Sequence, residues 1–333
     1  MEQQINQSIY ELAGQTLCRY AEAIAKNLEG TLQAEDIEPV HQVRVACRRL
    51  RTALRLFAVC LDKKLLRRWR KESKRLLKGF QKARDLDVQI QFLNDFLPQI
   101  PPSKKDVLPG LKRLLLRLRQ QRQRFQKRLL KSIDRFRREN ILSEIFAETE
   151  RLKQMQGPAP ASGLPSAADL AKTAVREAME RTLALLPCLQ EKENIQGHHR
   201  LRIAVKRLRY TLEILQPVFQ EEGGRWIQPL KKMQTLLGDL NDCAVWLEQI
   251  EQFSTDEEKR TQEYFGHARP FKRLEPGIEF LRRNRKQQWQ VLYREASAYC
   301  RKLEKDRFWD QLAEAAASSN AIPLQQTYGQ SPA

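Results

Sequence analysis

The sequence has little of what marks membrane, secreted or disulfide-linked proteins. Its 333 residues contain no apolar run close to the ~18 residues that a membrane-spanning helix needs. The first residues lack the basic-then-apolar pattern of a secretory signal. The six cysteines are scattered without a CxxC pair, which indicates reduced thiols. We therefore expect a cytoplasmic protein without a membrane partner.

Glycine and proline are also scarce, with 13 and 15 residues, and Leu, Arg, Lys, Gln, Glu and Ala, which favour helices, are abundant. No alternating apolar pattern longer than a few residues is present, so strands are not expected. The sequence predicts an all-α fold. Apolar periodicity and the positions of the prolines place helices over 5–29, 38–60, 63–97, 110–138, 140–155, 167–186, 197–216, 225–252, 256–268 and 276–306.

One stretch, rich in proline and alanine and poor in charge, divides the chain near its middle. It is followed by Ser166 and Asp169, which form a capping-box pattern at the start of a helix. The predicted organisation is an N-terminal helical bundle over 1–156, a linker over 157–165, a C-terminal helical bundle over 166–316 and a disordered tail over 317–333.

Positive charge is concentrated in the first half. The chain carries 60 Lys and Arg against 41 Asp and Glu, a formal charge of +19. Residues 1–156 hold a net charge of +16 and residues 157–333 only +3. A field of this size predicts a polyanionic partner: a nucleic acid, an anionic membrane or another phosphate polymer.

An internal repeat relates the two halves. Seven of seventeen residues are identical between 41–57 and 199–215. Further along, 84–88 aligns with 241–245 at nearly the same offset, 157 residues instead of 158. Two matching segments make chance similarity of Arg-rich helices an unlikely explanation. The repeat predicts two similar helical bundles related by a pseudo-twofold axis.

Cations form rows along several predicted helices. At about 100° per residue, the cations of 41–55 fall within an arc of about 80°, opposite an apolar face. The equivalent predicted helix in the second half carries a shorter row. The second half keeps only Lys231 as a counterpart to the row on 63–97. The rows are His41, Arg44, Arg48, Arg51 and Arg55; His199, Arg202, Lys206 and Arg209; Lys64, Arg67, Lys71, Lys74, Lys78 and Lys82; and Arg113, Arg117, Arg124, Arg128, Lys131 and Arg135.

A row of this kind can be an ordinary solvated helix face, and for any single row this is the simpler interpretation. Solvated faces, however, usually mix charges of both signs. Here like charges stand three and four residues apart, which destabilises each helix by a few tenths of a kcal/mol per pair. Taken together, the rows favour a polyanion that neutralises them.

The two His-x-x-Arg-x-x-x-(Arg/Lys)-Arg-Leu-Arg segments, with the Arg-Asp-x-Asp-Val of 84–88 and the Leu-Leu-Gly-Asp-Leu-Asn-Asp of 236–242, resemble the CHAD family, the conserved histidine α-helical domain. The resemblance covers about 5–310. It implies two four-helix bundles facing each other across a basic cavity that binds long-chain inorganic polyphosphate; members can associate with polyphosphate granules. By motif match, the resemblance places in that cavity His41, Arg44, Arg48, Arg49, Arg51, His199, Arg202, Lys206, Arg207 and Arg209.

The predicted function is non-enzymatic binding of long-chain polyphosphate, with other polyanions as further candidate partners and granules as a candidate location. The alternative is a single-stranded RNA-binding protein, although the aromatic residues fall mostly on apolar helix faces. No cofactor is expected, and no prediction of oligomeric state is made. The predicted binding residues are His41, Arg44, Arg48, Arg49, Arg51, Arg55, Arg67, Lys71, Lys74, Lys78, Arg117, Arg124, Lys131, His199, Arg202, Lys206, Arg207, Arg209 and Lys231.

Other roles for the motif residues have weaker support. His41 and His199 could bind a metal ion or act as phosphoacceptors, but no partner ligands stand at regular spacing from them. Hydrogen bonding of each imidazole to phosphate or to a neighbouring helix end is therefore favoured. Asp85 and Asp242 could be catalytic acids, but each repeat has only one such carboxylate. Capping of a turn, or pairing with an arginine of the motif helix, is the favoured role.

Overall fold

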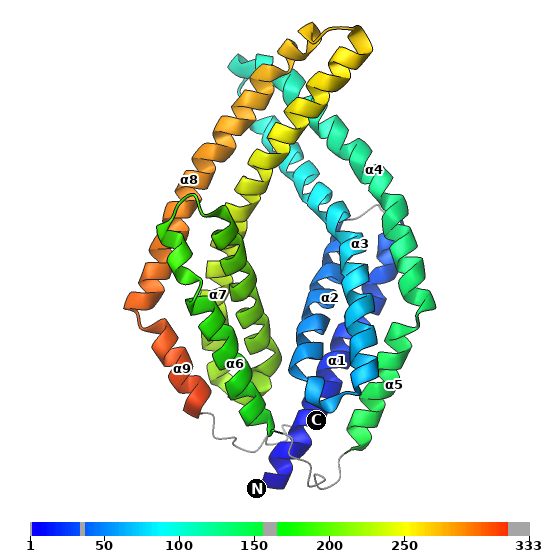
Figure 1. The fold of residues 1–333 in the computed structure, drawn as a ribbon, viewed down its shortest axis with the longest axis vertical. Coiled ribbons are helices and arrows are strands. Elements are labelled where there is room, and N and C mark those ends of the chain that lie inside the picture. Colours follow the sequence, from blue (N-terminus) through cyan, green and yellow to red (C-terminus); the bar gives the residue numbers. More distant parts are fainter. Residues whose placement is uncertain (1, 34–36, 156–164, 319–333) are drawn as a thin grey trace, which may run out of the picture.

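The structure, a computed structural model, describes residues 2–33, 37–155 and 165–318 (Figure 1). This part of the chain contains helices and turns but no strand, so the predicted all-α fold is confirmed. Short 3-10 segments connect several of the helices. The α-helices are α1 (Glu2–Gln33), α2 (Glu38–Leu56), α3 (Lys63–Phe96), α4 (Leu108–Arg138), α5 (Ile141–Gln154), α6 (Ala167–Leu183), α7 (Ile195–Phe265), α8 (Glu275–Lys305) and α9 (Phe308–Ser318).

Two helix starts show the capping that their sequences favour. The Asp62 carboxylate accepts hydrogen bonds from the backbone N–H groups of Lys64 and Leu65, at 2.8 and 3.0 Å, and so begins α3. The Ser166 hydroxyl accepts from the backbone N–H of Asp169 at 3.1 Å, which confirms the predicted start of α6.

Helix α7 folds back on itself. His199 Nδ1 lies 2.6 Å from Asn241 Oδ1, whereas 42 residues of straight helix would span roughly 63 Å. The chain therefore reverses between Pro217 and Pro229, both of which lie inside α7. We call the parts on either side the first and second arms of α7. They run antiparallel, dark green and yellow in Figure 1, and contain the predicted helices over 197–216 and 225–252.

The predicted break between 252 and 256 is wrong, because α7 continues to Phe265. Ser254, Thr255 and Asp256 suggest a helix start, but Thr255 Oγ1 donates to the Glu251 carbonyl at 3.2 Å, as within a continuous helix. The helix ends at Gly266, whose φ of 75° lies in the left-handed region that favours glycine.

The C-terminal helix α9 is missing from the predicted helices. Arg307, with φ of 53°, separates it from α8, and Phe308, Trp309 and Leu312 pack into the main core. Residues 317 and 318 therefore belong to a helix and not to the predicted tail. The rest of that tail, and residues 157–164 of the predicted linker, lie outside the described residues.

The helices form two halves that meet at both ends of the elongated molecule, with α1–α5 on one side and α6–α9 on the other (Figure 1). The main hydrophobic core includes residues of both halves, from Ile9 in α1 to Ala316 in α9. At the opposite end, a second core joins Leu93 of α3 and Leu111 of α4 to Ile250 of α7 and Leu281 of α8. Helices α2 and α7 also contact each other across the two halves.

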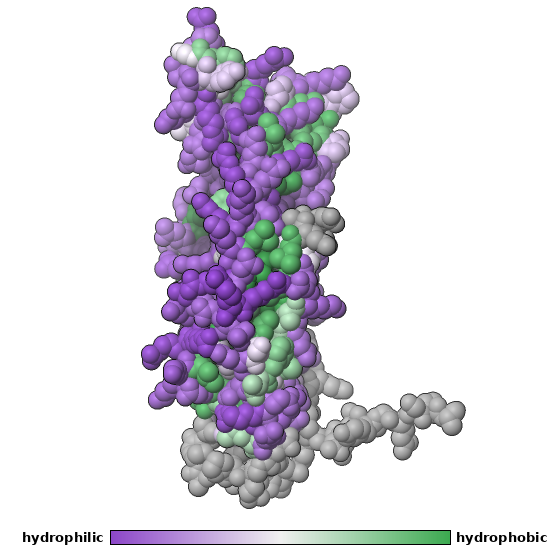
Figure 2. Space-filling view, turned by 90° about the vertical axis from the view of Figure 1, so that its right-hand side faces the viewer, coloured by the Kyte–Doolittle hydropathy of each residue, from purple (hydrophilic) through white to green (hydrophobic). Residues whose placement is uncertain are grey.

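Hydrophilic side chains dominate the face on the α4 and α5 side, where apolar residues form only separate patches (Figure 2). None of the helices in the described ranges combines the length and apolar character needed to cross a membrane.

Candidate functional site

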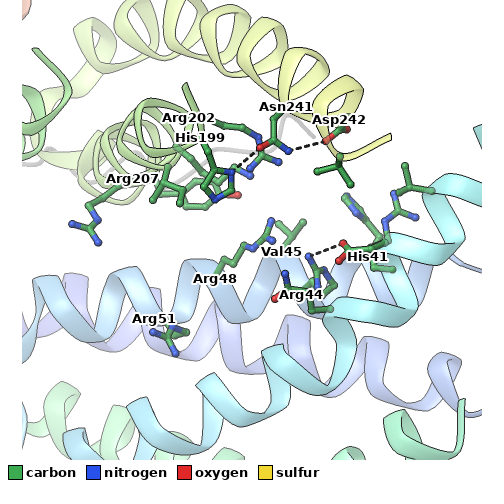
Figure 3. Close-up of a pocket in the computed structure, with 18 of the residues that line it drawn as sticks. His41, Arg44, Val45, Arg48, Arg51, His199, Arg202, Arg207, Asn241 and Asp242 are labelled. Atoms are coloured by element: carbon green, nitrogen blue, oxygen red, sulfur yellow. Dashed lines mark hydrogen bonds and ion pairs between the residues drawn. The ribbon is translucent and has the colours of Figure 1, made fainter. Parts of the chain in front are cut away.

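A pocket of about 710 Å³ lies between the two halves. Its lining comes from α2, from one stretch of α3 and from both arms of α7 (Figure 3). The positive residues among the lining are His41, Arg44, Arg48, Arg51, Arg55, Arg84, His199, Arg202, Lys206 and Arg207. The polar and apolar remainder is Val45, Thr52, Gln81, Asp85, Val88, Gln89, Ile203, Tyr210, Asn241, Asp242, Val245 and Trp246.

The α2 side of the pocket is the predicted cationic face of this helix. All five positive residues of the row line the pocket, because their spacing of three and four residues keeps them on one side of a helix. The opposite side of α2 is fully buried in the main core, through residues such as Val43, Cys47, Leu50 and Leu54. Core packing of the apolar face therefore fixes the direction in which the cations point.

The first arm of α7 supplies the repeat of this face. His199, Arg202 and Lys206 line the pocket from the other half, together with Arg207. In Figure 3, Arg48 extends from α2 toward the arm of α7 that carries Arg202. The structure thus brings together the cationic residues of both predicted motif helices around one space.

Within the described part of the chain, several guanidinium groups in the pocket have buried nitrogen atoms without a hydrogen-bond partner. Arg44 is only 6% exposed, and its one ion pair is a distant contact of 3.9 Å between Nη2 and Asp85 Oδ1. Its Nη1 is buried without a hydrogen bond, as are Arg51 Nη1 and Arg202 Nε. A buried donor left without a partner costs about 1–3 kcal/mol. An anion in the pocket would satisfy these donors.

Burial and repulsion by neighbouring cations also lower the pKa values of Arg44, Arg55 and Lys206. Burial, and then the charge of Arg48, lower the pKa of Arg44 to about 10, although Asp85 opposes the shift. Burial, and then Arg207, lower the pKa of Arg55 to about 10. The pKa of Lys206 falls furthest, to about 7, through burial and then Arg202. The positive charge of the side chains that line the pocket therefore exceeds their negative charge.

The motif carboxylates and His199 have local partners. The Arg44–Asp85 contact confirms the favoured role of Asp85 as the partner of a motif arginine. Burial raises the pKa of Asp85 even beside these cations. His199 is hydrogen-bonded to Asn241 of the second arm of α7, and Asn241 Nδ2 donates to Asp242 Oδ1 at 3.3 Å. Over the described ranges, no three His, Cys, Asp or Glu side chains are grouped to hold a metal ion.

Two predicted binding residues, Arg49 and Arg209, lie beside the pocket and share one carboxylate where the halves meet. Arg49 Nη2 of α2 donates to Glu213 Oε2 of α7 at 3.1 Å, and Arg209 donates to the other oxygen of the same carboxylate. Both guanidinium groups lie over the ring of Tyr210, at 5.7 and 4.7 Å from its centroid. Arg49 and Arg209 are therefore not part of the pocket lining.

The row on α3 lies outside the pocket but on the same face of its helix. Arg67, Lys71, Lys74 and Lys78 are exposed, and at 100° per residue all four fall within about 40° of Asp85, which lines the pocket. They form a cationic path along α3 away from the pocket. Lys231, on the second arm of α7, is exposed and also lies outside the lining.

The α4 row does not line the pocket, so the structure does not bring the predicted binding residues Arg117, Arg124 and Lys131 into this space. Helix α4 packs against α3 and α8 and runs along the outer edge of the molecule (Figure 1). Arg117 forms two hydrogen bonds, of 2.7 and 2.9 Å, with Glu257, which is only 2% exposed. Arg124 and Lys131 are exposed.

The lining includes residues that sequence reasoning did not select. Arg84 and Asn241 stand at equivalent places in the two repeats, directly before Asp85 and Asp242, so the repeat itself could have identified them. Four aliphatic residues also line the pocket at equivalent positions, as the pairs Val45 and Ile203, and Val88 and Val245. Their apolar character predicts core residues, so the sequence has no signal that separates these four from the core.

The fold and the sequence both have known relatives. The CHAD domain of the plant Ricinus communis is similar in structure, with a TM-score of 0.63, 22% identity, and 94% of this chain and 93% of that chain covered. PptA from Streptomyces chartreusis gives a TM-score of 0.58 at 16% identity, covering 86% of this chain and 96% of that one. No curated protein sequence matches significantly. The family model of the CHAD domain matches residues 15–251. The chain therefore belongs to the CHAD domain family.

Proposed function

We propose that this protein binds long-chain inorganic polyphosphate in the pocket between its two halves, without catalysing a reaction on it. The observation that carries the proposal is the meeting of two equivalent cationic helix faces around one space, with buried donors of Arg44, Arg51 and Arg202 left unpaired. Membership of the CHAD domain family, which is linked to polyphosphate, supports the choice of ligand.

The chemistry of the lining fits a linear phosphate polymer. Arginine binds two oxygens of a phosphate at once, and lysine adds a compact charge. The α2 row spans fourteen residues, or roughly 20 Å, so successive phosphates can each meet a cation. A chain longer than the pocket continues along the exposed cations of α3, Arg67, Lys71, Lys74 and Lys78. Much of the affinity then comes from the release of counterions.

The aromatic residues favour polyphosphate over single-stranded RNA. Proteins that bind single strands stack bases on accessible aromatic rings. In this pocket Tyr210 and Trp246 are 6% and 4% exposed, and two guanidinium groups cover the Tyr210 ring. A base would find no free ring there, whereas a phosphate chain needs none.

A binding role also fits the carboxylates. Of the lining residues, only Asp85 and Asp242 are acidic, and Asp85 is paired with Arg44. Hydrolysis or transfer of phosphate normally uses carboxylates that hold divalent metal ions. We propose that the protein acts in the cytoplasm as a polyphosphate-binding module and associates there with polyphosphate granules.

A competition assay tests this function. Labelled long-chain polyphosphate is bound to the protein at physiological salt, and unlabelled long polyphosphate, single-stranded RNA or tripolyphosphate is added at equal phosphate concentration. We expect long polyphosphate to displace the label and the other two to displace far less. Equal displacement by RNA would favour the nucleic-acid alternative, and release of phosphate during the assay would contradict a purely binding role.

A further inference from the structure

Lys206 has an unusual environment for a lysine. It lies on the first arm of α7, in the pocket wall, and within the described residues its amine has no hydrogen bond or ion pair. The charges that act on it most strongly are all positive: Arg202 and Arg209 on its own helix, and Arg44 and Arg48 on α2. The two pocket carboxylates, Asp85 and Asp242, act on the neighbouring arginines instead.

We propose that Lys206 is an acyl-acceptor site for small anionic acyl donors of the acyl phosphate class, and that its acylation weakens polyanion binding in the pocket. The first part depends only on the pocket, and the second part rests on the proposed function. The geometry supplies a site that attracts a phosphate group, through the unpaired donors of Arg44 and Arg202, and places the side chain of Lys206 in the lining of the same pocket.

The attraction of the donor follows from the unpaired guanidinium groups. Arg44 Nη1 and Arg202 Nε are buried donors without acceptors, and the charges of both residues act on Lys206, Arg202 from the same helix and Arg44 from α2. A phosphate group provides oxygens for such donors, and arginine is well suited to hold it. The acyl group of a bound acyl phosphate then finds aliphatic lining, which includes Ile203, 46% exposed, one turn before Lys206.

The reactivity follows from the free amine. An ordinary lysine, with a pKa of about 10.4, has roughly one amine in a thousand unprotonated near pH 7.4. Burial and the surrounding arginines lower the pKa of Lys206 to about 7 in the protein without ligand, so a large fraction of its amine is free at that pH. The charge of a bound phosphate group opposes part of this shift. A less basic amine is intrinsically less nucleophilic, which removes part of this gain but not all of it.

The step balances with the acyl phosphate as the only co-reactant. The lone pair of Nζ attacks the carbonyl carbon, a C–N bond forms, and the bond from that carbon to the phosphate oxygen breaks. Inorganic phosphate leaves with the bonding electrons, and the amine loses its proton to water. The product is a neutral amide. It can no longer take up a proton and become a cation when a polyanion enters the pocket.

Site-resolved mass spectrometry of the full chain tests the acceptor role. The protein is treated with acetyl phosphate at pH 7.5, and initial rates are measured at Lys206 and at the exposed Lys71 and Lys231, which lie outside the lining. We expect at least tenfold faster acetylation at Lys206. Equal or slower modification of Lys206 would overturn the proposal. A neutral ester serves as control: an equally large preference with that donor would overturn the assignment to anionic donors.

The consequence for binding is measured separately. K206Q imitates the acylated side chain, and K206R keeps the charge. We expect K206Q to bind long polyphosphate about five- to tenfold more weakly than wild type, and K206R to lose much less affinity than K206Q. Unchanged binding by K206Q would overturn the second part. If Lys206 is acetylated selectively while wild type does not bind polyphosphate, the proposed function fails and the acceptor site stands.

Discussion

Glu213 of α7 holds Arg49 of α2 across the interface between the halves, with Arg49 Nη2 3.1 Å from Glu213 Oε2. Its other oxygen pairs with Arg209, and the side chain of Glu213 is only 18% exposed. One carboxylate thus neutralises two arginines of the repeated motif. The interaction uses two residues that the sequence assigns to ligand binding, and it lies where α2 and α7 come together beside the pocket.

Replacing this carboxylate should destabilise the protein. We expect E213Q to lower the free energy of unfolding by about 1–3 kcal/mol, because it leaves two partly buried guanidinium groups without their counter-charge. Thermal or urea unfolding measures the change. The matched control is E177Q, which removes the carboxylate of an exposed Glu–Arg pair four residues apart, each partner 53% exposed, and should cost less than about 1 kcal/mol. Equal effects of both substitutions would contradict the bridging role.

Polyphosphate affinity should fall as the pH rises through neutrality. Burial and nearby arginines lower the pKa of Lys206 to about 7 in the free protein, and a bound polyanion raises it. Between the pKa of Lys206 in the free protein and its higher pKa in the complex, binding takes up a proton. The association constant therefore falls by up to tenfold per pH unit in this range. Burial lowers the pKa of His41 below its usual 6.5, so that residue is already neutral there.

Titration calorimetry between pH 6.5 and 8.5 checks this dependence. Because arginine keeps its charge throughout that range, the K206R variant should bind with much less change. If K206R kept the full pH dependence of binding, that dependence would have to come from another titrating group. In wild-type protein without ligand, Lys206 is more fully protonated in the unfolded chain than in the folded one between about pH 7 and 10. Its contribution therefore makes the free energy of unfolding rise with pH over this range.

The α3 row should matter for long chains and not for short ones. We expect K71Q/K74Q to weaken binding of long polyphosphate several-fold and to leave tripolyphosphate binding unchanged, because a short chain fits within the pocket. Loss of two neutralised charges should also reduce the salt dependence, by about 0.7 in log–log slope per charge on the analogy of single-stranded nucleic acid.

Binding isotherms over a range of salt concentrations measure both effects. Equal weakening for tripolyphosphate would place Lys71 and Lys74 in the short-chain site, contrary to their position outside the lining.

Helical periodicity identified which face of each helix is cationic, but not which faces meet. On α2, knowledge of the cationic face was enough to predict its direction, because the apolar face is fully buried and the cationic face must point away from the core. On α4 the periodicity was equally clear, yet that helix lies at the outer edge and Arg117 binds Glu257. Packing between helices far apart in sequence decides this, and a single sequence does not encode it locally.

The repeat carried more information than the charge. It paired Arg202 and Lys206 with Arg44 and Arg48 as equivalent residues, the family resemblance placed all four in one cavity, and all four line the pocket. It did not reveal that Arg49 and Arg209 share Glu213, because this contact depends on the relative placement of the halves. Helix ends were less predictable: Thr255 resembles a helix start in sequence, but it is an exposed residue inside α7, where its neighbours Phe253 and Glu257 are buried.

The most direct measurement compares two variants that remove the same charge from different places. R48Q/R202Q removes two cations from the pocket, and R124Q/K131Q removes two exposed cations from α4, outside the lining. Equilibrium binding of long polyphosphate at physiological salt should weaken at least tenfold for the pocket variant, because charge-assisted contacts are lost there. The α4 variant should stay within about twofold of wild type. Equal losses would show that only net charge matters, and would contradict a binding site in the pocket.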